Sequence, residues 1–189
     1  MAEEVKKVAL ITGGGSGIGR SAALALQKDG FHVIVCGRRV DQLEETASLG
    51  ATDTPAITAI APDVTNGASV KSLFSELETS YGRLAILFNN AGMGAPRVEL
   101  DELAEDAWRN CVDVNLTGSF LCAQAAFKIM KSQSPQGGRI INNGSISAHA
   151  PRPNTIAYTA TKHAITGMTK TIALDGRAYS IACSQLDIG

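Results

Sequence analysis

Short apolar segments alternate with amphipathic segments along the whole chain. The apolar segments are rich in Val, Ile and Leu and are bounded by Gly, Asp or Asn, a pattern that is typical of buried strands. The pattern predicts six strands, over Val8–Thr12, His32–Cys36, Ala56–Ala61, Leu84–Phe88, Arg139–Asn143 and Ile181–Leu186.

The intervening segments carry apolar residues at helical spacing. In the first of them Ile18, Ala22 and Leu26 recur on one side of a helix, and Gly30 closes it, as a residue able to adopt positive φ should. Thr65 is expected to cap a later helix that reaches about Tyr81. The first predicted helix spans Gly17–Asp29. The others span Asp41–Leu49, a long helical region over Asp101–Lys131, and Asn154–Leu174.

Strands that alternate with helices indicate βαβ units and a parallel sheet. Because such crossovers are right-handed, we expect a doubly wound, three-layer α/β fold of the Rossmann type, with strand order 3-2-1-4-5-6. Neither a repeat nor a linker divides residues 1–189, which predicts one domain. Ser132–Gly138 is expected to be a surface loop.

Charge and composition narrow the possible partners. The net charge is −1, with 44% hydrophobic and 19% charged residues, so nothing favours binding to nucleic acid or to an anionic membrane. No apolar run is long enough to span a bilayer, and the acidic start Met1–Lys7 is a poor signal peptide. We therefore infer a soluble, cytoplasmic protein.

The four cysteines are scattered and have no neighbouring His at ligand spacing. This spacing favours small buried side chains in a reducing compartment over a disulfide framework or a metal site. They are Cys36, Cys111, Cys122 and Cys183.

A glycine-rich turn joins the first strand to the first helix. Its spacing is TGxxxGxG, through Gly13, Gly17 and Gly19, rather than the GxGxxG fingerprint. Glycines allow a tight turn and a close ligand, and the N-terminus of the next helix attracts a pyrophosphate. A flexible loop would show similar glycines, but the position between strand and helix favours a cofactor turn that includes Ser16 and Ile18.

The end of the second strand bears on the choice of cofactor. An acid there would favour NAD(H), but Gly37 occupies that position and Arg38 and Arg39 follow it. Guanidinium groups grip a phosphate in a bidentate manner, so we expect NADP(H) to be preferred and NAD(H) to be less favoured. The alternative is that one or both arginines are solvated surface residues.

Asp63 and Val64 follow the third strand. Asp63 could accept a hydrogen bond from the adenine amino group while Val64 packs on the ring. Taken alone, the same pair is an ordinary strand end.

Tyr158 and Lys162 are four residues apart in a predicted helix and so share one face. An ammonium group close to a phenol stabilises the phenolate, so Tyr158 could exchange a proton with an alcohol or carbonyl near neutral pH. Ser145 follows the fifth strand, where the carboxyl ends of strands line a ligand crevice, and could hydrogen-bond the substrate oxygen. The alternative to a catalytic pair is a Tyr/Lys pair on the protein surface. Ser147 is a second candidate for the role given to Ser145.

Together these residues resemble the single-domain branch of the short-chain dehydrogenase/reductase family. Asn89-Asn90-Ala91-Gly92 is similar to its NNAG motif, which implies that Asn90, Ala91 and Gly92 border the cofactor. The resemblance implies that Tyr158 is the general acid/base and that Lys162 binds the nicotinamide ribose. It also implies that Ser145 polarises the carbonyl and that Asn115 holds a water in a proton relay.

The chain departs from this family after the sixth strand. Asp187-Ile188-Gly189 stands where the family has Pro-Gly, and we expect the family's substrate loop, next helix and seventh strand to be absent. The resemblance also implies a homodimer or homotetramer, paired through the long helices.

The favoured function is hydride transfer between NADP(H) and a carbonyl or secondary alcohol. The alternatives are an epimerase of the family's extended branch, and a nucleotide-binding protein or truncated fragment without turnover. The substrate is not readable. The expected pocket wall is modestly apolar, which suggests a small or medium molecule; it comprises Met93, Gly94, Ala148, His149 and Pro151.

Overall fold

The computed structural model describes residues 7–52 and 54–189, so the prediction for the segment before Lys7 lies outside the described residues. Within them, six strands form one sheet in the order β3-β2-β1-β4-β5-β6, and every neighbouring pair is parallel. The strands are β1 (Val8–Thr12), β2 (His32–Cys36), β3 (Ile57–Ile60), β4 (Ile86–Asn89), β5 (Gly138–Asn143) and β6 (Ile181–Leu186). The predicted order is confirmed.

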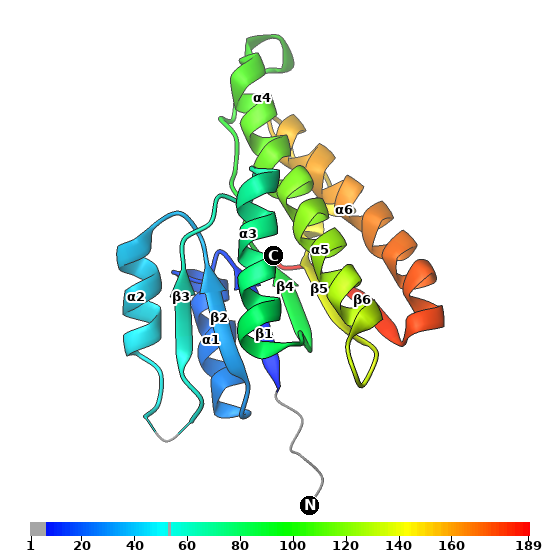
Figure 1. Ribbon diagram of the computed structural model, residues 1–189. Coiled ribbons are helices and arrows are strands. Elements are labelled where there is room, and N and C mark those ends of the chain that lie inside the picture. Colours follow the sequence, from blue (N-terminus) through cyan, green and yellow to red (C-terminus); the bar gives the residue numbers. More distant parts are fainter. Residues whose placement is uncertain (1–6, 53) are drawn as a thin grey trace, which may run out of the picture.

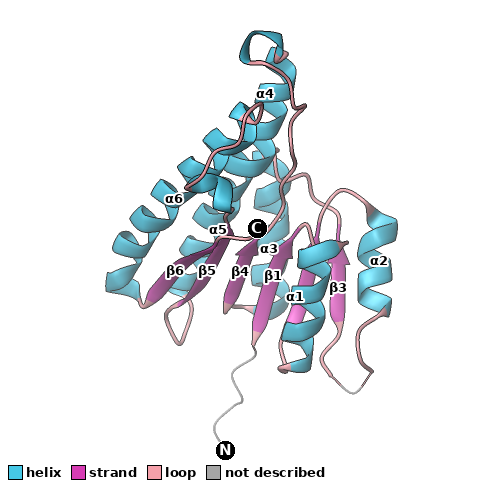
Figure 2. Ribbon diagram, turned by 180° about the vertical axis from the view of Figure 1, so that it is seen from behind, coloured by secondary structure: helices cyan, strands magenta, loops and turns pink. Residues whose placement is uncertain are grey.

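Helices cover both faces of the sheet (Figures 1 and 2), which makes a three-layer, Rossmann-like fold. On one face lie α1 (Gly17–Lys28) and α2 (Val40–Ser48). The other face carries α3 (Gly67–Tyr81), α5 (Gly118–Ser132) and α6 (Ile156–Asp175).

The central strand β1 shows why this sheet needs two covering layers. Its side chains alternate between faces, and all five residues are buried. Val8 and Leu10 belong to the core beneath α3 and α5, whereas Ile11 packs with Ala23 of α1 and Leu43 of α2. A strand buried on both faces is expected to be largely apolar, and here only Thr12, at its carboxyl end, is polar.

The cap of α3 differs from the prediction. Asn66, not Thr65, precedes the helix, and its Oδ1 accepts hydrogen bonds from the N–H groups of Ala68 and Ser69 at 2.9 and 3.1 Å. The Thr65 hydroxyl donates instead to Asp63. Both residue types cap helices well, so their order alone did not distinguish them.

The predicted helical region Asp101–Lys131 is helical without a break from Glu105 to Ser132, but it is not one regular α-helix. A short 3-10 turn, Leu100–Glu102, is followed by α4 (Glu105–Val112). A π-helical turn, Asp113–Thr117, then joins α4 to α5. A π turn accommodates one extra residue and re-aims the side chains on it.

Candidate functional site

The glycine turn depends on its missing Cβ atoms. The N–H groups of Gly13 and Gly14 donate to the Cys36 carbonyl at 2.7 and 3.2 Å, which draws the turn onto the end of β2. Gly13 has φ of +67°, and a Cβ on Gly19 would overlap the Gly13 carbonyl oxygen. The backbone of the turn lies in direct contact with the start of α1, and only glycine fits at these two positions.

Arg20 and Thr46 hold this turn from outside, and the sequence did not indicate either. The Arg20 guanidinium donates to the Gly15 carbonyl at 2.6 Å and pairs with Glu45 at 2.7 Å. The Thr46 hydroxyl donates to the Gly14 carbonyl at 3.0 Å. A turn restrained in this way is preorganised for a ligand.

Asn90 ties β4 to the turn after β1. Its side-chain amide donates to the carbonyls of Thr12 and Gly13 at 3.0 and 3.2 Å. The Thr12 hydroxyl in return accepts the N–H groups of Asn90 and Ala91, both at 2.9 Å. Asn143 of β5 donates to Asn90 Oδ1 at 2.9 Å, so three strand ends are connected at one point.

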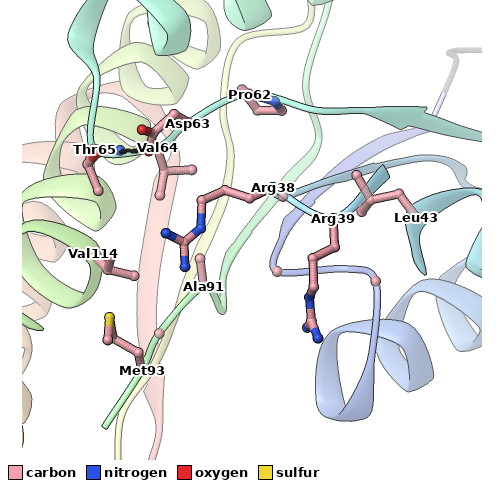
Figure 3. Close-up of a pocket in the computed structure, with 14 residues that line it drawn as sticks. Arg38, Arg39, Leu43, Pro62, Asp63, Val64, Thr65, Ala91, Met93 and Val114 are labelled. Atoms are coloured by element: carbon pink, nitrogen blue, oxygen red, sulfur yellow. Dashed lines mark hydrogen bonds between the residues drawn. The ribbon is translucent and has the colours of Figure 1, made fainter. Parts of the chain in front are cut away.

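A pocket of about 420 Å³ opens beside the turn (Figure 3). Among its lining residues are seven that the sequence assigned to the cofactor, namely Gly13, Arg38, Arg39, Asp63, Val64, Ala91 and Gly92. The remaining assigned residues do not line it; they are Ser16, Gly17, Ile18, Gly19, Asn90, Tyr158 and Lys162. The pocket runs from the glycine turn to the segment after β3 and does not extend to Tyr158 or Lys162.

The two arginines of this pocket differ in direction. Arg38 extends toward Val64 and Ala91, whereas Arg39 points toward the start of α1 (Figure 3), where it donates to the Ser16 hydroxyl at 3.2 Å. Hydrogen bonds from Thr65, aided by the charge of Arg38, hold the pKa of Asp63 below its usual value. Arg38 and Asp63 thus lie toward the β3 end of the pocket, whereas Arg39 lies toward the glycine turn.

Lys162 is the buried cation of the predicted catalytic group. Its Nζ donates to the Asn143 carbonyl at 2.6 Å and lies 5.5 Å from the centre of the Tyr158 ring. Burial lowers the pKa of Lys162, and the nearby ionisable groups of Cys111 and Asp187 oppose that effect. The structure therefore brings Tyr158 and Lys162 together on α6, as their spacing predicted.

Ser145 lies at the end of β5 and is buried. Its Oγ accepts a hydrogen bond from the backbone N–H of Ser147 at 3.1 Å, so this bond joins Ser145 to its own turn and not to Tyr158. Because that bond uses a lone pair, the Ser145 hydroxyl keeps its proton to donate.

Asn115 lies in the π turn and is nearly fully engaged. Its Oδ1 accepts the N–H of Met93 at 2.8 Å, and its Nδ2 donates to the Met93 carbonyl at 2.9 Å. The same Nδ2 lies 3.3 Å from the hydroxyl of Thr161, the neighbour of Lys162. Asn115 thus joins the segment after β4 to α6.

The sequence missed a role for Asp187. Its Oδ1 accepts the Ser145 N–H at 3.0 Å, and its Oδ2 lies 2.8 Å from His149 Nε2. Burial would raise the pKa of Asp187, but the bonds from His149, Gln185 and Ser145 together hold it below its usual value. The sequence drew attention to Asp187 only because it departs from the family's Pro-Gly, and that departure did not indicate contacts with Ser145 or His149.

The expected pocket wall is only partly present. Met93 lines the pocket beside the glycine turn, Gly94 lines a second cavity beside Tyr158, and Pro151 lines a third, outer one. Ala148 and His149 line none of the three.

Within residues 7–52 and 54–189, none of the helices combines the length and the apolar character that a membrane span requires. Over the same part of the chain, no group of three or more His, Cys, Asp or Glu side chains is placed to hold a metal ion. Cys36, Cys111 and Cys122 are buried, Cys183 is half-buried, and all four are free thiols.

The sheet order and the glycine turn define a Rossmann-like fold. The chain belongs to the short-chain dehydrogenase/reductase family, whose short chain dehydrogenase model matches residues 7–189. A 3beta-hydroxysteroid dehydrogenase of Mediterraneibacter gnavus is 34% identical over 188 residues, covering 96% of this chain and 64% of the relative. This chain is thus shorter than the curated relatives it matches.

Solved structures agree with this assignment. A 3-ketoacyl-(acyl-carrier-protein) reductase from Brucella melitensis, complexed with NADH, has a TM-score of 0.90 and 31% identity, over 96% of this chain and 74% of its own. A variant actinorhodin polyketide ketoreductase with NADPH has a TM-score of 0.91 and 30% identity, over 99% and 71%. Both are similar to this chain in sequence as well as in fold.

Proposed function

We propose that the protein transfers a hydride between NADP(H) and a carbonyl or secondary alcohol, with Tyr158 as the general acid/base. The observation that carries the proposal is the position of Tyr158 and buried Lys162 on one face of α6. Lys162 Nζ lies 5.5 Å from the centre of the Tyr158 ring and 2.6 Å from the carbonyl oxygen of Asn143, the last residue of β5. Residues 1–189 would then form a cofactor-binding domain.

The cradle suits a dinucleotide, because a Cβ on Gly14 or Gly19 would overlap Val35 or the Gly13 carbonyl. When bound, the nicotinamide ring would supply or accept the hydride. The pyrophosphate would lie against the N-terminus of α1, with Ser16, Gly17 and Ile18 around it. The adenine would lie between Arg38 and Val64, near Asp63.

The proton would move through Tyr158. Its hydroxyl donates a proton to the carbonyl oxygen during reduction and takes it back during oxidation. The Ser145 hydroxyl donates to the same oxygen, since Ser147 occupies its acceptor side. Lys162 stabilises the phenolate and binds the ribose, while Asn115 holds a water that refills the relay.

A preference for NADP(H) rests on Arg38. Its guanidinium lines the pocket beside Ala91 and Val64, and no acid ends β2, which closes with Cys36 before Gly37. Similar proteins occur with NADH and with NADPH, so the residues of this chain must decide. Arg38→Gln should weaken binding of NADPH by about 10-fold or more and leave NADH within about 2-fold. Equal losses for both cofactors would contradict the preference.

The activity itself is tested by the loss of NADPH absorbance with a panel of ketones and aldehydes. The wild-type protein should turn over at least one of them, and Tyr158→Phe should lower kcat by about 100-fold or more without changing the dissociation constant for NADPH. If NADPH binds and wild type and Tyr158→Phe are equally inactive, the protein is a nucleotide-binding protein without turnover.

We further propose a homodimer or homotetramer that pairs through α5 and α6. An apolar groove between these helices includes Phe120, Phe127 and Met168, and the side chain of Phe120 is 48% exposed. Burying such a surface favours association. Phe120→Asp should shift the sedimentation of the protein toward the monomer.

A further inference from the structure

A second cavity of about 260 Å³ is lined in part by Tyr158. It is separate from the pocket at the glycine turn, because the two share no lining residue. Its lining consists of Gly94, Ala95, Arg97, Ser147, Arg152, Thr155 and Tyr158. The residue proposed to exchange the proton therefore shares a cavity with two guanidinium groups.

Both arginines are available to a ligand. Arg97 and Arg152 are exposed, and neither guanidinium forms a hydrogen bond or an ion pair with any residue that the structure describes. No Asp or Glu lines the cavity, although Glu99 lies two residues after Arg97. Two unpaired cations on one small cavity are a binding site for an anion.

The backbone presents both side chains from restricted segments. Pro96 precedes Arg97, and Arg152 stands between Pro151 and Pro153. Proline fixes its own φ and restricts the residue before it, so less backbone freedom is lost when a ligand binds.

The start of α6 adds to the positive potential. Thr155 precedes this 20-residue helix and lines the cavity, but its hydroxyl donates to the Arg152 carbonyl at 2.7 Å rather than capping the helix. The N–H groups of the first turn and the positive end of the helix dipole therefore face the same region as the arginines.

We propose that this cavity binds an anionic group of the substrate, so that the enzyme acts on carbonyl or hydroxy compounds that carry a carboxylate or a phosphate. The inference rests on the proposed function, since Tyr158 fixes the reacting end of the molecule. An anion-binding cavity differs from the modestly apolar pocket wall expected from the sequence, which included neither Arg97 nor Arg152.

Matched pairs of neutral and anionic probes test this class. We would compare levulinate with methyl levulinate, and dihydroxyacetone phosphate with dihydroxyacetone, in the presence of NADPH. Both kcat/KM and the dissociation constant from NMR titration would be measured for the full chain. At least one anion should be favoured by about 10-fold or more in both quantities, and the pair with the larger ratio identifies the anion.

Arg97→Gln and Arg152→Gln should each reduce that ratio to about 3-fold or less while the neutral probe is unaffected. Arg177→Gln, at the far end of α6, is the matched control and should keep the wild-type ratio. Equal binding of both members of each pair, or arginine variants that weaken neutral and anionic probes alike, would overturn the anion site. If no probe is turned over, the proposed function fails, whereas the binding ratio still decides the site.

Discussion

The carboxylate of Asp187 accepts a hydrogen bond from the backbone N–H of Ser145, with 3.0 Å between Oδ1 and N. This bond joins the end of β6 to the end of β5 at the residue proposed to polarise the substrate. The other oxygen of Asp187 holds His149 at 2.8 Å, so the carboxylate restrains both sides of the turn Ile146–Ala148.

Removing this carboxylate should loosen the turn without unfolding the protein. Asp187→Ala should lower kcat/KM by about 10-fold, because a positioned hydroxyl contributes little when its backbone moves. Asp187→Asn retains an acceptor oxygen and should lose less. The dissociation constant for NADPH, measured by fluorescence titration, should change by less than about 2-fold. An Asp187→Ala protein with wild-type kinetics would refute the positioning role.

Asp187 should also contribute to the pH dependence of stability. Its pKa is lower in the folded protein than the usual 3.8, so its contribution is present above that pH and is lost as pH falls through the folded pKa. Urea unfolding at a series of pH values between about 6 and 2 should show this loss for wild type and a smaller one for Asp187→Asn. Identical slopes for the two proteins would show that the carboxylate is not stabilised by folding.

Lys162 should be important for catalysis and costly for stability. Lys162→Met should lower kcat by about 100-fold or more, since it removes the cation beside Tyr158. Its thermal midpoint at neutral pH should equal or exceed that of wild type, because burying an ammonium group costs free energy.

The sign of the pH effect on Lys162 follows from burial. Burial lowers the folded pKa below the usual 10.5, so the unfolded chain binds more protons and this contribution to stability rises with pH in that window. Lys162→Met should lack the rise in scans between about pH 7 and 10. A variant that melts well below wild type at every pH would contradict a net cost of burial.

Two glycine substitutions should act in opposite directions. Gly19→Ala places a methyl group on the Gly13 carbonyl and should destabilise the fold by about 1–3 kcal/mol and abolish tight NADPH binding. Gly167→Ala, on α6, meets nothing within 4 Å and should stabilise by about 0.5–1 kcal/mol. Denaturant unfolding measures both, and a neutral Gly19→Ala would show that the turn can relax.

The sheet was predictable because its signals are local. Each strand of this fold is a short apolar run, and β1, β2 and β6 have the predicted bounds. The division of Asp101–Lys131 was not predictable, because the π turn is stabilised by contacts of Asn115 with Met93 and Thr161, which are distant in sequence.

The site divides in the same way. The spacing of Tyr158 and Lys162 and the glycines of the turn are local patterns, so the sequence indicated them. Arg20, Arg97 and Asp187 have no such pattern, because each acquires its surroundings only when separate loops meet. The roles proposed for Ser145 and Asn115 stay predictions that the kinetic variants test.

The link between Asn90 and Thr12 has a consequence for folding. These residues are 78 positions apart in the chain, yet their mutual hydrogen bonds hold the glycine turn in place. Closing so long a loop is slow compared with forming a helix, and the pairing of β1 with β4 needs the same closure. The pocket beside the glycine turn should therefore appear late in refolding, so that recovery of NADPH binding would follow the pairing of β1 with β4 rather than the pairing of β1 with β2.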